Sequence, residues 1–193
     1  MRRNAKRLPV PAALALILAI AVLGGFLFDC ICTAIERQTH PRKYAEYVVV
    51  YAEAYDVPED VIYAVIRTES HFDSAAVSRA GAVGLMQLMP ETFLWLTNDM
   101  LGEHLSEAVL YDPETNIRYG TYLLSRLYTR YGDWETAAAA YNAGSGTVDE
   151  WLKDPSYTDQ YGFLNRIPYK ETASYVKKFS AARKTYQRLY YSK

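Results

Sequence analysis

The chain has 193 residues, of which 50% are apolar and 22% are charged, and it contains 18 tyrosines. This composition is typical of a folded protein and argues against an intrinsically disordered chain. Four of the 21 cations precede Leu8, so residues 8–193 carry 17 cations against 22 acids. This acidic balance argues against nucleic acid as a partner.

The first feature along the chain is an apolar run from Leu8 to Phe28, whose 21 residues carry no charge and could cross a bilayer as a helix. Residues 1–7 are basic, so the positive-inside rule predicts that they are cytoplasmic and that the rest of the chain is extracytoplasmic. We therefore expect residues 8–28 to be a single-pass signal anchor in the cell membrane. A cleaved signal peptide is the alternative, although no Ala-x-Ala-like site follows the run. A lipoprotein is disfavoured because Cys30 does not follow small residues.

The segment after the apolar run is predicted to be a linker, at residues 29–43, because it is polar from Thr33 onward and contains Pro41. Cys30 and Cys32 are the only cysteines, and an intermolecular disulfide between chains is open. The three histidines are scattered without ligand spacing, so we expect neither a metal site nor a cofactor. The oligomeric state stays undetermined at this point.

The remaining residues, 44–193, have the pattern of an all-α domain. Tyr44 to Tyr55 is apolar over much of a helical surface and is followed by Asp56. Pro58-Glu59-Asp60 is typical of a helix start, with a proline in the first turn and acids beside it. The next helix is expected to bury one apolar stripe made by Ile62, Val65 and Ile66.

The second half of the domain has equally clear helix signals. Asp112-Pro113-Glu114 predicts an N-cap, a proline and an acid in the first turn, and Gly132 predicts the end of that helix. Asp133 begins a further segment, whose four alanines at 137–140 allow another backbone to approach closely. After a loop at 153–167, a last helix beginning near Pro168 is predicted to bury Tyr175, Phe179, Ala182, Tyr186 and Leu189.

Glu69 is the residue whose position is hardest to explain by folding alone. It follows Ile62 by seven residues, Val65 by four and Ile66 by three, so its carboxylate lies on the apolar face of its helix. It also lies at the helix C-terminus, where the helix dipole disfavours negative charge. Burial and the dipole both raise a carboxyl pKa, which suits a general acid. The structural alternative is a glutamate that turns to solvent or pairs with a nearby arginine, Arg67 or Arg79.

The segment from Ser70 to Met89 is poorly periodic and is predicted to turn at its glycines. It presents Ser78, Gln87 and Met89 soon after the acid. A glutamine side chain offers both a donor and an acceptor, which suits sugar hydroxyl and acetamido groups. The alternative for its methionines is simple core filling.

Three stretches of sequence carry a resemblance. They are Glu69-Ser70-x-Phe72 with Ser78-x-x-Gly81-Ala82-x-Gly84-Leu85-Met86-Gln87-Leu88-Met89-Pro90, then Ala140-Tyr141-Asn142-Ala143-Gly144, then Ile167-Pro168-Tyr169-Lys170-Glu171-Thr172 with Tyr175-Val176. In this order they resemble the catalytic domain of the soluble lytic transglycosylases, glycoside hydrolase family 23, which implies a goose-type lysozyme-like fold from about Tyr44 to Tyr186. Asp73-Ser74 departs from the family, which often has Asn-Pro or Asp-Pro there.

The resemblance implies that the substrate is the glycan strand of peptidoglycan. Glu69 would protonate the oxygen between N-acetylmuramic acid (MurNAc) and N-acetylglucosamine (GlcNAc). The same glutamate would then deprotonate the C6 hydroxyl of the muramic sugar, and the product would carry a 1,6-anhydroMurNAc end. The residues that this resemblance assigns to substrate binding are Ser78, Gln87, Met89, Tyr141, Asn142, Glu171 and Tyr175.

Three of these assignments have either support from the helix pattern or an alternative explanation. Glu171 precedes Tyr175 by four residues, so we expect both side chains on the inward stripe of the last helix. Core packing is the alternative for Tyr141 and Tyr175. Asp73, Asp112 and Asp133 are better explained as turn or cap residues.

Two further functions remain open from the sequence. A goose-type lysozyme-like hydrolase would cleave the same bond with a positioned water, and Asp73 is the nearest candidate for its second carboxylate. A non-catalytic cell-wall-binding scaffold would retain the fold without the chemistry. An intact Glu69 favours an enzyme over the scaffold.

Overall fold

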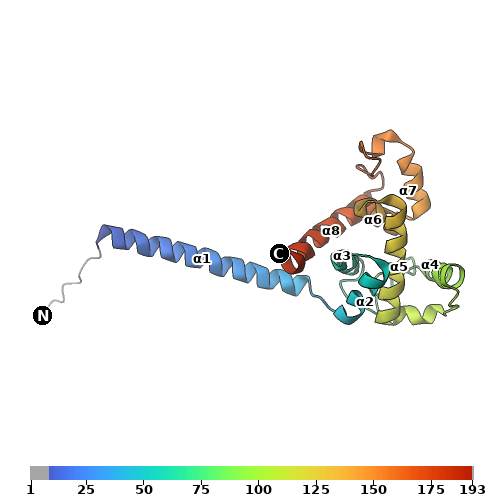
Figure 1. The fold of residues 1–193 in the computed structure, drawn as a ribbon, viewed down its shortest axis with the longest axis horizontal. Coiled ribbons are helices and arrows are strands. Elements are labelled where there is room, and N and C mark those ends of the chain that lie inside the picture. Colours follow the sequence, from blue (N-terminus) through green and yellow to red (C-terminus); the bar gives the residue numbers. More distant parts are fainter. Residues whose placement is uncertain (1–8, 193) are drawn as a thin grey trace. The chain divides into compact units, whose positions relative to one another are not determined.

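A computed structural model describes residues 9–192. The predicted cytoplasmic segment 1–7 and Leu8, at the start of the predicted anchor, lie outside the described residues. The chain divides into two units, with the boundary between Pro41 and Arg42. Within the described part the elements are helices joined by loops, with three isolated β-bridges and no strand, as expected for an all-α protein (Figure 1).

The first unit consists of one long helix, α1 (Val10–Thr39). Among the described residues it is the one helix long and apolar enough to cross a membrane. It extends beyond Phe28, so the predicted linker at 29–43 is helical as far as Thr39, because no helix breaker occurs before Pro41. The steric restriction that a proline imposes on the preceding residue explains why the helix ends there. Cys30 and Cys32 are free thiols on this helix.

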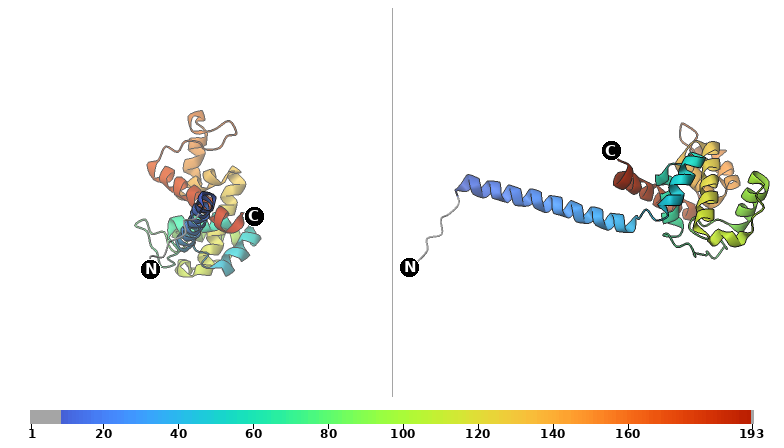
Figure 2. Two further views of the ribbon diagram at one scale, coloured as in Figure 1. Left: turned by 90° about the vertical axis from the view of Figure 1, so that its left-hand side faces the viewer. Right: turned by 60° about the horizontal axis from the view of Figure 1, so that its bottom comes forward.

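The second unit packs the other helices into one domain (Figures 1 and 2). The α-helices are α2 (Ala45–Tyr55), α3 (Glu59–Glu69), α4 (Pro90–Leu94), α5 (Pro113–Tyr131), α6 (Trp134–Ala143), α7 (Ser145–Leu152) and α8 (Lys170–Tyr186). Short π-helical segments η1 (Trp95–Leu101) and η4 (Gln187–Tyr191) and 3₁₀ segments η2 (Glu107–Tyr111) and η3 (Pro155–Tyr157) complete the described elements.

The centre of the domain is α3. Its residues 61–66 are all fully buried, so the helix is enclosed on every side and not only along the predicted stripe. It packs along α8, and Asp60 fixes the pair because its carboxylate accepts hydrogen bonds from Arg183 Nε and Gln187 Nε2, both at 2.8 Å. A helix so surrounded holds its C-terminal residue in a fixed place, and that residue is Glu69.

The predicted caps form as expected. The Asp112 carboxylate accepts a hydrogen bond from Thr115 N at 2.8 Å at the start of α5, and Asp133 accepts one from Thr136 N at 2.7 Å at the start of α6. Gly132, at φ +68°, ends α5 in the left-handed conformation that glycine tolerates best. The five residues predicted to be buried along the last helix are buried, although Leu189 lies in η4.

Arg42, the first residue of the second unit, is held by the aromatic end of the domain. Its guanidinium lies 5.7 Å from the ring centres of Tyr63 and Tyr190 and 5.5 Å from that of Tyr191. It also forms an ion pair with Glu59 at 2.7 Å. The start of this unit is therefore joined both to α3 and to η4.

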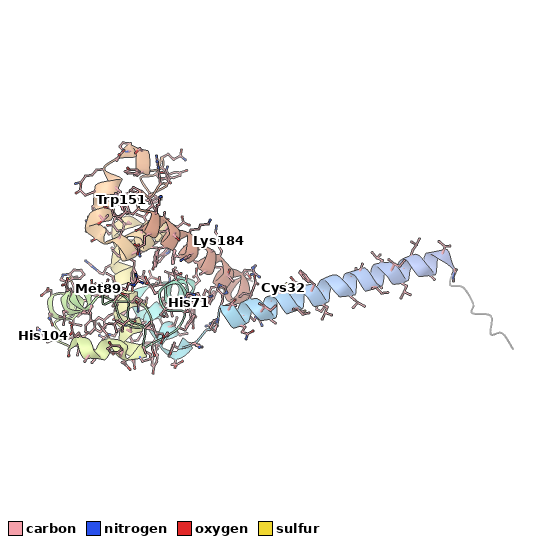
Figure 3. The ribbon with its side chains drawn as sticks, turned by 180° about the vertical axis from the view of Figure 1, so that it is seen from behind. Cys32, His71, Met89, His104, Trp151 and Lys184 are labelled. Carbon is pink, nitrogen blue, oxygen red and sulfur yellow. The ribbon has the colours of Figure 1, made fainter. Side chains whose placement is uncertain are left out.

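The segments that the sequence did not predict are α4, η1, η2, α7 and η3, the last of which lies within the predicted loop at 153–167. Figure 1 and the left view of Figure 2 show α7 and the loop after it projecting from one end of the domain. Trp151, labelled in Figure 3, packs edge-on against Tyr169, which precedes α8. This contact ties the projecting part to the start of α8.

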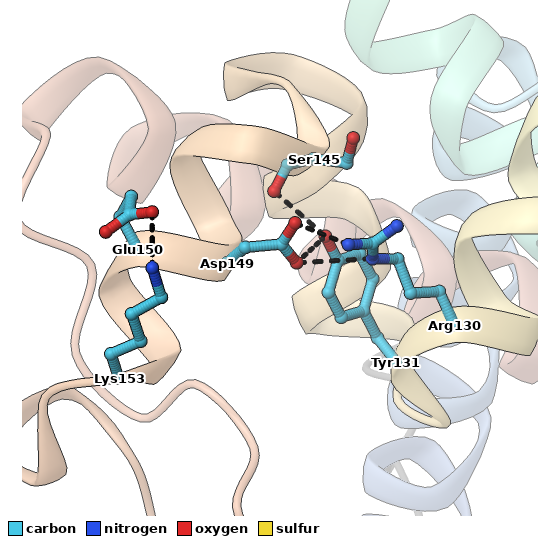
Figure 4. Close-up of polar contacts among 6 residues, drawn as sticks. All are labelled: Arg130, Tyr131, Ser145, Asp149, Glu150 and Lys153. Carbon is cyan, nitrogen blue, oxygen red and sulfur yellow. Dashed lines mark hydrogen bonds and ion pairs between the residues drawn. The ribbon is translucent and has the colours of Figure 1, made fainter.

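A polar cluster holds the other side of α7 against the end of α5 (Figure 4). Arg130 donates to both carboxylate oxygens of Asp149. The Tyr131 hydroxyl donates to the same carboxylate at 3.0 Å and lies 3.1 Å from the Ser145 carbonyl oxygen. The projecting helix therefore has fixed contacts on two sides.

Candidate active site

Glu69 is the last residue of α3 and is half-buried. Burial raises the pKa of its carboxyl from 4.5 to about 7, whereas the nearby Tyr175 hydroxyl opposes this rise. Among the described residues it forms no ion pair, so the predicted alternative of pairing with an arginine does not occur. A carboxyl group in this state can hold a proton near neutral pH and release it.

Two tyrosines stand beside this carboxyl group. Tyr175, from α8, is buried, and its hydroxyl makes no hydrogen bond of standard geometry with any described residue. Tyr141, from α6, donates its hydroxyl proton to the Met86 carbonyl oxygen at 2.7 Å. Burial and the charge of Glu69 raise the pKa of both phenols well above 10, so both stay protonated as donors.

The turn at residues 83–88 forms a wall behind these groups, and it is fixed by one buried side chain of α5. The amide of Asn116 accepts from Met86 N at 2.8 Å and donates to the carbonyl oxygens of Val83 and Leu110 at 2.9 Å each. Asn116 is 1% exposed. A Cβ at Gly84 would collide with its amide and with the Leu110 carbonyl oxygen, so only glycine fits there.

The same turn is joined to the end of α3. Ser70, the residue after Glu69, donates its hydroxyl proton to the Leu85 carbonyl oxygen at 2.7 Å. His71 and Phe72 follow with positive φ angles of 53° and 69°. Non-glycine residues adopt this conformation only when the surrounding contacts hold it, so the chain direction after Glu69 is closely constrained.

A cleft of about 290 Å³ opens beside Glu69. Four of the predicted residues line it together, namely Glu69, Asn142, Glu171 and Tyr175. The sequence analysis missed its other lining residues, Thr68, Ser174 and Lys178. The signal was present in the helix period, because residues 171, 174, 175 and 178 have the spacing of one helical face.

Ser78, Gln87 and Met89 lie in the segment between α3 and α4 and, like Tyr141 of α6, do not line this cleft. Ser78 Oγ accepts a hydrogen bond from Ala82 N at 3.0 Å, and Gln87 Nε2 donates to the Ala76 and Gly84 carbonyl oxygens at 3.0 and 2.9 Å. Met89 is 37% exposed and precedes α4 (Figure 3). In the structure, the polar groups of this segment stabilise the turn.

Glu171 requires a correction. The helix pattern predicted an inward side chain beside Tyr175, but Glu171 is exposed at the edge of the cleft. It lies in the first turn of α8, beyond the packed part of the helix, where the helix dipole favours an acid. Asp73, by contrast, is a turn residue as expected, because its carboxylate accepts a hydrogen bond from Ala75 N at 3.0 Å.

The raised pKa of Glu69 predicts a pH-dependent effect on stability. Below pH 4.5 the carboxyl group is neutral in both the folded and the unfolded state. Above pH 7 it is ionised in both, and because the folded state disfavours the ionised form, the free energy of unfolding is lower there by up to about 3 kcal/mol. Relative to the wild type, Glu69→Gln is therefore expected to be more stable at pH 8.5 than at pH 4.5. Urea unfolding of both proteins at the two pH values measures this. An equal difference at both values would contradict it.

Comparison with known proteins places this site in a family. A family model described as the transglycosylase SLT domain matches residues 46–163, more than half of the chain. The soluble lytic murein transglycosylase of Escherichia coli K12 is 34% identical over 160 residues, which are 81% of this chain and 24% of that protein. The membrane-bound lytic murein transglycosylase C of Haemophilus ducreyi is 30% identical over 173 residues, 77% of this chain and 47% of that protein.

Solved structures agree with the sequence comparisons. The 70 kDa soluble lytic transglycosylase of Escherichia coli has a TM-score of 0.75 and 33% identity, covering 82% of this chain and 26% of that one. An inactive glutamate-to-glutamine mutant of the lytic transglycosylase Slt from Pseudomonas aeruginosa has a TM-score of 0.69 and 34% identity, covering 78% and 25%. The chain thus spans about a quarter of the length of the soluble proteins that it matches.

Proposed function

Because the chain belongs to the transglycosylase SLT domain family, we propose that it is a peptidoglycan lytic transglycosylase. It cleaves the MurNAc-β-1,4-GlcNAc bond without water and leaves 1,6-anhydroMurNAc ends. One observation carries the proposal: Glu69 is a half-buried carboxyl group with a pKa of about 7 that lines a cleft and has no ion-pair partner among the described residues. Such a group can donate a proton and then accept one at the same pH.

The proposed reaction uses Glu69 twice. Its protonated carboxyl group donates to the glycosidic oxygen as the bond from that oxygen to C1 of the muramic sugar breaks. The positive charge that develops at C1 is shared with the 2-acetamido group of the same sugar. The ionised carboxylate then removes the proton of the C6 hydroxyl, whose oxygen bonds to C1. Glu69 ends protonated, and no water is consumed.

The neighbouring groups supply orientation. Tyr175 brings an unpaired hydroxyl group to the carboxylate, and Asn142 brings an amide to the cleft wall. We assign Tyr141 to holding the turn in place, since its proton is engaged by Met86. Ser78, Gln87 and Met89 remain predicted binding residues for sugar units beyond the cleft.

The product separates this reaction from hydrolysis. Asp73, the expected second carboxylate of a hydrolase, is engaged in a turn, which favours the non-hydrolytic route. Mass spectrometry of fragments released from purified peptidoglycan by residues 34–193 is expected to find anhydromuramyl ends. Reducing ends would instead indicate hydrolysis, with Glu171 as the next carboxylate to test. Binding without release would indicate a scaffold.

The pH dependence of kcat/KM is expected to follow the protonation of the Glu69 carboxyl group. The free enzyme needs Glu69 protonated, so kcat/KM should be highest below pH 7 and fall about tenfold for each pH unit above it. Initial rates on soluble glycan strands between pH 5 and 9 measure the profile. A rate that increases through pH 7 would show that the ionised form is the active one and would contradict the acid role.

We further propose that the N-terminal apolar segment anchors the enzyme in the cell membrane, with the second unit on the extracytoplasmic side. The length and composition of α1 support this anchor, as does the similarity to membrane-bound lytic murein transglycosylase C. The predicted span at residues 8–28 places the domain next to its polymeric substrate. Alkali extraction of membranes tests this, because an integral protein stays in the pellet and a cleaved one does not.

A further inference from the structure

Charge is unevenly distributed along the sequence of the domain. Residues 42–169 carry 9 cations against 19 acids, whereas residues 170–192 carry 6 cations against a single acid, Glu171. The second stretch contains α8 and η4. A basic helix on an otherwise acidic domain indicates a surface for an anionic partner.

Two lysines of α8 are available to such a partner. Lys177 and Lys184 are exposed, and their ammonium groups form no ion pair or hydrogen bond with a described residue (Lys184 is labelled in Figure 3). They are seven residues apart, which is about 10 Å along one face of a helix. Arg183, by contrast, is paired with Asp60 at 2.8 Å, and Lys178 lines the cleft.

Both lysines line a groove of about 500 Å³ along α8. Leu164 and Ile167, from the loop before this helix, and Val176, from the helix itself, give the groove an apolar lining. Its α8 residues are turned from those of the cleft by roughly 140°, at about 100° per residue. The groove is therefore separate from the cleft, and its volume lies in the usual range of ligand sites, roughly 300 to 1,000 Å³.

The groove also contains one acid, Glu135 of α6. One of its carboxylate oxygens accepts a hydrogen bond from Ser180 Oγ at 2.6 Å, and the other makes no hydrogen bond with a described residue. A phosphate polymer would be repelled by this carboxylate and would not use the apolar lining. A short peptide that carries carboxylates, an amino group and aliphatic carbon atoms matches the cations, the acid and the apolar lining together.

We propose that this groove binds a peptide stem of peptidoglycan, at a place separate from the cleft in which the glycan strand is cleaved. Lys177 and Lys184 bind carboxylates of the stem, and Glu135 binds its amino group. The choice of a stem rests on the proposed function, which names peptidoglycan as the substrate. A second contact with the same polymer raises the effective concentration of glycan at the cleft, so the enzyme stays on the wall between cleavages.

The test measures binding of a purified stem peptide to the full chain in detergent by saturation-transfer NMR, a method suited to weak ligands. A dissociation constant of about 1 mM is expected for so small a ligand. Lys184→Glu should weaken binding about fivefold, and Lys184→Arg should retain it. Conversion of the carboxylates of the peptide to carboxamides should weaken binding by a similar factor. Position 184 is exposed, so these substitutions leave the core intact.

Lys178→Glu is the matched control. It makes the same change of charge on the same helix, but on the face that lines the cleft. The control should keep the affinity of the wild type for the peptide. An equal loss in Lys178→Glu and Lys184→Glu would show binding at the cleft or a general charge effect, and either would overturn the groove as the site.

Other results would also overturn it. Equal binding of the free and the amidated peptide, or no binding of either, would refute the groove whether or not the wild type cleaves peptidoglycan. If the wild type cleaves none, the proposed function fails, but peptide binding that is weakened only in Lys184→Glu still supports the groove. Tighter binding of inorganic polyphosphate than of the peptide would refute the assignment to a peptide.

Discussion

Glu69→Gln is expected to lower the rate of glycan cleavage about a thousandfold, the loss typical of removing a general acid. Glutamine keeps the size of the side chain and its ability to hydrogen-bond, but it cannot supply a proton to the glycosidic oxygen or remove one from the C6 hydroxyl. Both steps of the proposed reaction therefore fail together. Release of soluble fragments from purified peptidoglycan, followed over hours with excess enzyme, measures a loss of this size.

Two controls separate chemistry from folding in this experiment. Glu53→Gln removes an exposed carboxylate from α2 and should leave the rate unchanged. The stability of Glu69→Gln should equal or exceed that of the wild type at pH 8.5, since the substitution removes a buried carboxyl group that ionises there. A rate within tenfold of the wild type would rule out Glu69 as the acid and direct attention to Glu171.

Asn116→Ala is expected to destabilise the domain by about 3 kcal/mol. The substitution removes one acceptor and two donated hydrogen bonds. It leaves Met86 N without its acceptor and takes a donor from the Leu110 and Val83 carbonyl oxygens, the second of which still accepts from Leu88 N. The damage should extend to activity, because the freed turn supports both Ser70 and Tyr141. Urea unfolding at pH 7 measures the change in the free energy of unfolding.

The control for this second prediction is another asparagine. Asn165 is exposed, and its amide donates to the Thr158 carbonyl oxygen at 2.9 Å. Asn165→Ala should cost less than about 0.5 kcal/mol, as is usual for a surface residue. If Asn116→Ala costs no more than this control, the turn is held by other contacts and Asn116 is not its anchor.

The sequence predicted the elements that depend on local signals. Asp112 and Asp133 cap their helices, and Gly132 ends one of them, because these preferences act within a single turn of the chain. Glu69 was also predictable, since its spacing from Ile62 places it on the buried face of one helix. In each case the information lies within about seven residues, and helix geometry converts it into position.

What the sequence could not predict depends on contacts between distant segments. Asn116 lies on the first turns of α5 with no local signal, and its role exists only because the turn 83–88, about 30 residues earlier, folds against it. Gln87 is a second example. The sequence indicated an amide suited to a sugar, and the fold shows in addition that its side-chain nitrogen donates to two backbone carbonyl oxygens. A polar residue in a tight turn can serve either purpose, and only the packed structure decides.

The contacts that hold Arg42 have a consequence for how force would enter the domain. Any pull along the chain from the first unit enters the domain at this residue, where three aromatic rings and the Glu59 carboxylate hold the guanidinium. Glu59 is the first residue of α3 and Glu69 the last. The force is therefore transmitted to α3, the helix that ends at the candidate acid. Part of it is transmitted to η4, near the C-terminus. Tension from a tether would therefore reach the domain through its core helix and not through the turn at residues 83–88.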